Sequence, residues 1–162
     1  MSNMTMSAPA PVASAASSVL RTSTSIFLVK LTLSLALLFH DIGKPVSQKL
    51  KDMPFKDHAE LGVRIASSFM RFLGFPSTLI GDVTFLVRYH MLPAAIKHFP
   101  LYRVEKLMDS SLFPLLLEVY RADISSTFRA PSGYYEACRI YKTYLKKKKN
   151  PYRTLNRSRR IL

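Results

Sequence analysis

The segment His40–Pro45 (HDIGKP), directly after the apolar run Leu31–Phe39, constrains this chain more than any other feature. It places an imidazole and a carboxylate side by side at the expected end of a helix, and Gly43 and Pro45 then turn the chain. A long apolar run is normally buried, so two polar groups at its end need a partner. A divalent metal ion is suitable, because adjacent imidazole and carboxylate ligands can reach one ion.

Three further residues of ligand type, His58, His90 and Asp123, fall on separate segments with helical periodicity. The residues that share a helix face with them are Ala59, Gly62, Ile65, Ala66 and Phe69 for His58; Val83, Leu86 and Val87 for His90; and Leu112, Leu116 and Val119 for Asp123. Each of these faces is apolar and should point inward. The sequence therefore predicts that side chains from several helices meet at one site, with the carboxylates of Asp41 and Asp123 within about a nanometre of each other.

In order and spacing, these residues resemble the HD superfamily of metal-dependent phosphohydrolases. The closest resemblance is to the HD domain that follows the catalytic head in the tRNA nucleotidyltransferase/poly(A) polymerase (CCA-adding) family. The segments that carry it are LALLFHDIGKP (35–45), FKDHAELGVRIA (55–66), FLGFPSTLIGDVTFLVRYHMLP (72–93) and RADI (121–124).

The resemblance implies that His40, Asp41 and Asp123 hold a divalent metal ion, whether Mg, Mn, Ni, Co or Fe. Such an ion activates a bound water for attack on phosphorus.

It also implies that His58 and His90 either ligate a second ion or bind the scissile phosphate and protonate the leaving oxygen. Lys44 would supply a positive charge for the substrate phosphate. Structural alternatives remain open at this point. His58 could instead cap its own helix, and Asp123 could cap a helix or pair with Arg121.

Two departures from the family pattern affect the expected activity. Superfamily members carry another histidine on a helix before the HD pair, whereas no histidine precedes His40 here. The nucleotidyltransferase head, with its Gly-Ser turn and paired aspartates, is not found in the sequence. We therefore expect a fragment that cannot add nucleotides by itself.

The apolar spacing and the hydrophobic content of 48% predict an all-α fold, an HD-domain helical bundle with an irregular N-terminus and a basic C-terminal tail. The expected domains are 1–22, Ala/Ser-rich and poorly ordered or an incomplete first helix; 23–145, the HD domain; and 146–162, the basic tail. Helices are expected at about 23–39, 57–73, 77–91, 111–126 and 133–149, with a short helix at 103–108. A polar linker is expected at 46–56, and Ser77 is the expected N-cap of its helix.

More than half of the net charge of +14 lies in the last seventeen residues, which hold eight basic and no acidic side chains. This tail is either solvated or in contact with a polyanion. The residues proposed to contact tRNA are Lys146, Lys147, Lys148, Lys149, Arg153 and Arg157. The apolar run Ile26–Phe39 has fourteen residues and includes Lys30, so no membrane span is expected. The single cysteine, Cys138, excludes an intrachain disulfide and fits a cytoplasmic protein.

Two functions follow. The first is a metal-dependent phosphohydrolase that acts on phosphomonoesters or cyclic phosphodiesters of nucleotides or RNA ends. The alternative is a non-catalytic tRNA-binding helical module, or an inactive fragment of such an enzyme, in which the motif survives as buried scaffold.

Overall fold

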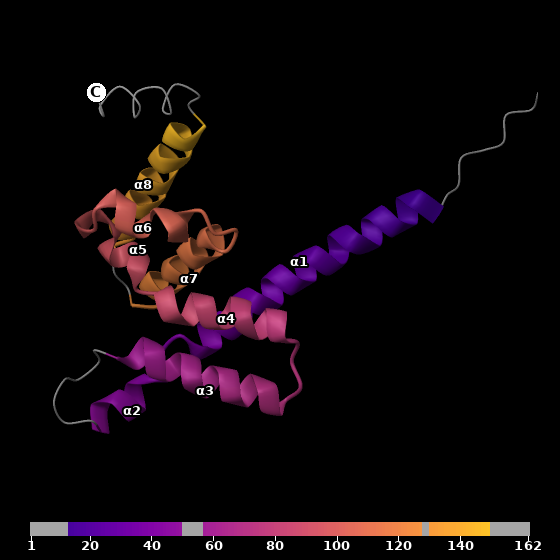
Figure 1. Ribbon diagram of the computed structural model, residues 1–162, viewed down its shortest axis with the longest axis horizontal. Coiled ribbons are helices and arrows are strands. Elements are labelled where there is room, and N and C mark those ends of the chain that lie inside the picture. The colour runs from indigo at the N-terminus through magenta and orange to yellow at the C-terminus, as the bar shows by residue number, and fades with distance from the viewer. Residues whose placement is uncertain (1–12, 50–56, 128–129, 150–162) are drawn as a thin grey trace, which may run out of the picture. The chain divides into compact units, whose positions relative to one another are not determined.

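The computed structural model describes residues 13–49, 57–127 and 130–149, and these residues form helices and turns without a strand (Figure 1). The predicted all-α class is therefore confirmed. In chain order the elements are α1 (Ala13–Phe39), α2 (Lys44–Lys49), α3 (His58–Phe72), α4 (Ser77–Tyr89), α5 (Leu92–Ala95), the 3-10 turn η1 (Ile96–His98), α6 (Leu101–Met108), α7 (Phe113–Ser126) and α8 (Ser132–Lys148).

The chain divides into two compact units, Met1–Leu31 and Thr32–Leu162. In the first unit the described residues belong to α1, which is helical from Ala13, earlier than the start near Ser23 that the sequence predicts. The second unit contains the last turns of α1 and all the other helices. The core and the candidate site both belong to this second unit.

The predicted helices of the second unit are present, with their breaks at the residues that the sequence indicates. α3 ends before Gly74, whose φ of 75° lies in the left-handed region that glycine adopts without strain. The prediction that Ser77 caps α4 is wrong. Pro76 is the N-cap, with extended backbone angles, and Ser77 is already the first helical residue.

Short helices occupy two segments that the sequence predicts as linker or loop. α2 includes the start of the expected polar linker 46–56, and α5 with η1 fills the stretch between the helices expected at 77–91 and 103–108. Pro45 and Pro93 both fall in the first turn of their helix, where the missing proline N–H has no helical partner to lose. Residues 50–56 of the predicted linker lie outside the described residues.

The main cluster of the hydrophobic core is centred on α7 and is completed by residues of α1, α4, η1, α6 and α8. The fully buried apolar side chains of the predicted faces are Ala66, Val83, Leu86, Val87, Leu116 and Val119. The sequence analysis missed Tyr144 of α8, which is 2% exposed and donates a hydrogen bond to Asp109.

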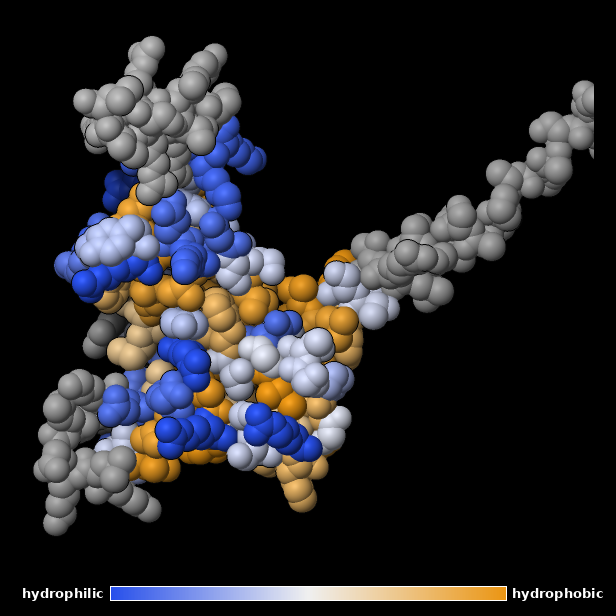
Figure 2. All heavy atoms as spheres, in the orientation of Figure 1, coloured by the Kyte–Doolittle hydropathy of each residue, from blue (hydrophilic) through white to orange (hydrophobic). Residues whose placement is uncertain are grey.

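Phe69 was predicted to face inward on α3, but its side chain is 49% exposed and Met70 is buried instead. The buried face of α3 is set by the line His58, Gly62, Ala66 and Met70, which turns Phe69 toward the rim, where its ring meets Phe39 edge-on. Figure 2 shows apolar side chains at the surface around α3 and α4, among polar ones. Phe72, 86% exposed, is the most exposed of the large apolar residues described.

Two segments, Thr24–Gln48 and Ser77–His98, are long and apolar enough to cross a membrane by length and composition alone. The first segment comprises the end of α1, the turn after it and most of α2, so it is longer than the fourteen-residue run considered in the sequence analysis. Core helices of soluble proteins pass the same test. Both segments also contain residues of the polar cluster described below, which are costly to place in a bilayer.

A close backbone approach fixes the HD turn against α3. A Cβ atom on Gly43 would lie 1.9 Å from the carbonyl oxygen of His58 and 2.7 Å from the backbone nitrogen of Gly62. Only glycine permits this contact. It places the turn after α1 directly beside the first turn of α3, where His58 lies.

Candidate metal centre

His40 and Asp41 lie in the turn after α1, and Asp123 reaches them from α7. The Nε2 atom of His40 lies 3.3 Å from Oδ2 of Asp41 and 3.5 Å from Oδ1 of Asp123. Ligand atoms from all three residues lie within 4.8 Å of one another. Asp41 and Asp123 are thus much closer than the nanometre within which the sequence places them.

His58 at the start of α3 and His90 at the end of α4 form a second group with the same aspartate. Their Nε2 atoms are 3.3 Å apart, and they lie 3.8 and 3.9 Å from Oδ1 of Asp41. Both histidines are almost completely buried, at 2% and 4% exposure. Asp41, His58 and His90 also satisfy the 4.8 Å criterion as a set.

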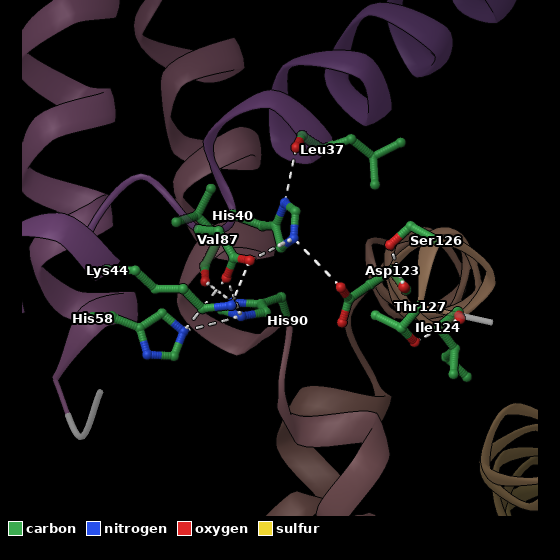
Figure 3. A network of polar contacts seen from close by, with 11 residues as sticks. Leu37, His40, Lys44, His58, Val87, His90, Asp123, Ile124, Ser126 and Thr127 are labelled. Carbon is green, nitrogen blue, oxygen red and sulfur yellow. Dashed lines mark hydrogen bonds and ion pairs between the residues drawn. The ribbon is translucent and has the colours of Figure 1, made fainter. Parts of the chain in front are cut away.

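Asp41 belongs to both groups, and its two oxygens face different partners. Oδ1 faces the buried histidine pair, whereas Oδ2 faces His40 and Lys44. Figure 3 shows the rings of His40, His58 and His90 gathered in one space, with Asp123 approaching His40 from the side of α7. The arrangement offers one shared carboxylate between two candidate cation positions.

Hydrogen bonds at the far side of two rings fix which nitrogen can act as a ligand. Nδ1 of His40 lies 2.8 Å from the carbonyl oxygen of Leu37, and Nδ1 of His90 lies 2.7 Å from that of Val87. A carbonyl oxygen only accepts, so each Nδ1 carries a proton and donates it. In the neutral ring, Nε2 then presents its lone pair to the cluster, which is the arrangement found in metal-binding histidines.

The pKa shifts of His90 and Asp41 also favour the protonation states in which these residues can bind a cation. Burial lowers the pKa of His90, with the hydrogen bond to Val87 opposing the shift. For Asp41 burial raises the pKa, but the hydrogen bond from Lys44 and the nearby positive charge outweigh it and leave the pKa below its usual value. A neutral imidazole and an ionised carboxylate are the forms that bind a cation, so the residues present fit a divalent metal ion.

Lys44 contacts the cluster through Asp41. Its Nζ atom donates to Oδ2 of Asp41 at 2.5 Å, across the turn. The side chain is 42% exposed, so it combines this ion pair with access to solvent. A cation bound to Oδ2 would compete with the ammonium group, and the lysine would then be available for an anion at the surface.

The structure also decides between the alternatives for individual residues. Asp57, not His58, is the N-cap of α3, so the capping alternative for His58 is wrong. Arg121 pairs with Glu118 at 2.7 Å and leaves Asp123 to the cluster. His98 is exposed and lies outside both ligand groups.

Two features of the site were not predicted from the sequence. The first is the pair of backbone carbonyls, Leu37 and Val87, that orient the histidine rings. The second is the division of Asp41 between two groups. A sequence signal for the first exists: His40 and His90 each follow the last residue of a helix, where the final carbonyls lack helical partners.

An all-helical bundle in which histidine and aspartate side chains cluster is typical of helical metal-binding proteins. Within this class, the HD domain family model matches residues 16–127, more than half of the chain, and the chain belongs to this family. The superfamily is of the metal-dependent phosphohydrolase type, and its members bind divalent metals.

Among curated proteins, the chain is similar to a CC-adding tRNA nucleotidyltransferase of Thermus thermophilus, with 39% identity over 84 residues. The match covers 46% of this chain and 19% of the relative, so the chain spans only about a fifth of that protein's length in the matched region. No solved structure gave a significant match.

Proposed function

We propose that this HD domain is a metal-dependent phosphohydrolase that cleaves phosphomonoesters or cyclic phosphodiesters of nucleotides or RNA ends. The observation that carries the proposal is the position of Asp41, whose two oxygens face the two groups of ligand atoms. A scaffold role alone would not require ionisable side chains from four helices to meet with their ligand atoms turned toward one another.

His40, Asp41 and Asp123 are the proposed ligands of a Mg, Mn, Ni, Co or Fe ion. When bound, such an ion polarises a phosphoryl oxygen and lowers the pKa of a coordinated water. The carboxylates supply the negative charge that holds the ion. The hydrogen bond from His40 to Leu37 keeps its Nε2 aimed at the cluster.

His58 and His90 are the proposed catalytic histidines, in either of two roles. Together with Oδ1 of Asp41 they can hold a second cation, or one of them can give a proton to the leaving oxygen. The lowered pKa of His90 favours the first role for this residue, because it stays neutral near pH 7. Lys44, half exposed beside Asp41, is the proposed contact for the substrate phosphate.

The substrate class is supported by the similarity to a tRNA nucleotidyltransferase. That relative acts on tRNA. Among the phosphoesters that a phosphohydrolase could cleave, we therefore propose those of nucleotides and RNA ends. We also propose a cytoplasmic location, which fits a chain with the single cysteine Cys138.

The decisive experiment measures bound metal and hydrolysis in the same preparations. The chain is loaded separately with each candidate ion and desalted, its metal content is determined by elemental analysis, and 2′,3′-cyclic nucleotides and nucleoside monophosphates are then assayed. Asp41→Asn keeps the shape of the side chain and removes its charge. Asp82→Asn, on α4 and outside both ligand groups, is the matched control.

We expect Asp41→Asn to reduce metal content and hydrolysis at least tenfold, with an unchanged circular dichroism spectrum, and Asp82→Asn to behave like the wild type. Retention of metal and activity by Asp41→Asn would refute the proposal. So would a wild-type chain that binds none of the ions after loading.

The second candidate, a tRNA-binding module, is favoured by the last turn of α8, which carries Lys146, Lys147 and Lys148. Lys148 pairs with Asp109, and Lys146 and Lys147 are exposed. Arg153 and Arg157, proposed as further contacts, lie outside the described residues. This function predicts tRNA binding that weakens steeply with salt, is lost on replacing Lys146 and Lys147 by glutamate, and is unaffected by chelation of metal. Unchanged binding by that double variant would exclude it.

A further inference from the structure

A cavity of about 310 Å³ lies between η1, α6 and α8, formed by residues outside the two ligand groups. Ile96, Val104 and Tyr144 form its buried floor, each at most 3% exposed. Phe99, which is 42% exposed, and Leu101 form an apolar edge at the surface. The volume is at the lower end of the range for sites that bind small molecules.

The cavity is bordered by cations and contains no acidic lining residue. Arg139, Thr143 and Lys147 line it from α8, spaced by four residues and therefore on one face of that helix. Lys97 lines it from η1 and pairs with Glu136 of α8 at 3.1 Å. Neither Arg139 nor Lys147 has an ion pair within the described part of the chain. Figure 2 shows hydrophilic side chains gathered around α6 and α8.

We propose that this cavity binds one nucleotide of a single-stranded RNA, with the base on the apolar floor and edge and the flanking phosphates at Arg139 and Lys147. The choice of RNA rests on the proposed function. The cavity itself is assigned on its shape and charge.

The spacing of the cations favours a nucleotide within a strand over an amphiphile with a single anionic group. Arg139 and Lys147 are eight residues apart, about 12 Å along the helix axis, and both line the cavity. A nucleotide within a strand has a phosphate on each side of its base. Phe99 at the edge offers a ring face for stacking, which binds bases of any sequence.

The test measures the affinity of the full chain for a fluorescein-labelled six-nucleotide RNA by anisotropy, at low and moderate salt. EDTA is present throughout, so neither cleavage nor a metal-bridged contact contributes. Two substitutions probe the cavity, Arg139→Glu and Phe99→Ala. Each has a matched control at an exposed position that does not line it, Lys142→Glu on the same helix and Tyr102→Ala on α6.

We expect Arg139→Glu to weaken binding about tenfold more than Lys142→Glu. Phe99→Ala should weaken it about tenfold at both salt concentrations, as loss of one stacked base does, and Tyr102→Ala less than twofold. Equal losses for the two charge reversals, or no loss for Phe99→Ala, would overturn the inference. Stronger competition by anionic phosphatidylglycerol vesicles than by unlabelled RNA would do the same.

The result is independent of hydrolysis. A chain that binds RNA through these residues but cleaves no phosphoester supports this inference while the proposed function fails. A chain that hydrolyses nucleotides and binds the RNA no better in wild-type form than in Phe99→Ala form gives the reverse result.

Discussion

Substitution of Gly43 by alanine is the sharpest structural test of how the site is assembled. The added methyl group would lie 1.9 Å from the carbonyl oxygen of His58, and ordinary van der Waals contact begins at 3.4 Å. The turn and the first turn of α3 must therefore separate by about 1.5 Å. The neighbouring atoms belong to the backbone and cannot rotate away as a side chain would.

Overpacking of this kind typically costs about 1–3 kcal/mol, and contact with a backbone atom places Gly43→Ala at the upper end, about 3 kcal/mol. For a unit of this size, the melting temperature should fall by about 10 °C. The same displacement separates Asp41 from His58 and His90, whose Nε2 atoms are now 3.8 and 3.9 Å from Oδ1. We therefore expect weaker metal binding as well as lower stability.

Urea denaturation monitored by circular dichroism gives the free energy of unfolding, and titration of Co²⁺ or Mn²⁺ into the folded protein gives metal affinity. Gly81→Ala is the matched control, since its added methyl group meets nothing within 4 Å and its position is on the surface of α4. This control should gain about 0.5–1 kcal/mol, because alanine is the better helix former. If Gly43→Ala unfolds within about 0.5 kcal/mol of the wild type and binds metal equally well, the close packing described for this turn is wrong.

Three further predictions concern the core and the cluster. Leu116→Ala, at a fully buried position, should lower the free energy of unfolding by about 2–5 kcal/mol in urea denaturation. Tyr144→Phe removes the hydrogen bond to Asp109 and should cost about 1 kcal/mol, and an unchanged midpoint would show that the bond contributes nothing. Burial lowers the pKa of His90 below 6.5 in the folded chain, so the unfolded chain binds the extra proton as the pH falls through that value. In EDTA the stability should thus fall below pH 6.5, by at most about 1.4 kcal/mol per pH unit from this group, and His90→Gln should flatten that part of the profile.

The helices that carry the cluster could be predicted because their periodicity is strong and their ends are marked. α4 shows its buried face in Val83, Leu86 and Val87, and Gly74 with Pro76 marks the break before it. α2 could not be predicted in this way, since its six residues hold little apolar pattern. In the structure Ser47 of α2 is buried, and its hydroxyl donates to the carbonyl of Lys44 in the same helix.

The residues of the candidate site could be identified from motif and helix face, but their pairing could not. Which histidine approaches which oxygen of Asp41 depends on where four helices place their ends, and no local pattern specifies that. Phe69 illustrates the same limit. Periodicity places it on the inner face of α3, yet the line His58, Gly62, Ala66 and Met70 is the buried one and Phe69 is half exposed.

The position of the His-Asp pair directly after a helix, rather than within one, is what allows both side chains to face the cluster. Successive residues of an α-helix point about 100° apart, so His40 and Asp41 could not both turn toward Asp123 and His90 if α1 continued. α1 ends at Phe39, and hydrogen bonds from Ile42 to Phe39 and from Lys44 to Asp41 close a tight turn instead.

The same helix end leaves the carbonyl of Leu37 without a helical donor, and the ring of His40 satisfies it. His90 repeats this arrangement after α4 with the carbonyl of Val87. Each histidine thus completes a helix end with one nitrogen and presents the other to the cluster, so the stability of the fold and the orientation of the ligands depend on the same hydrogen bonds.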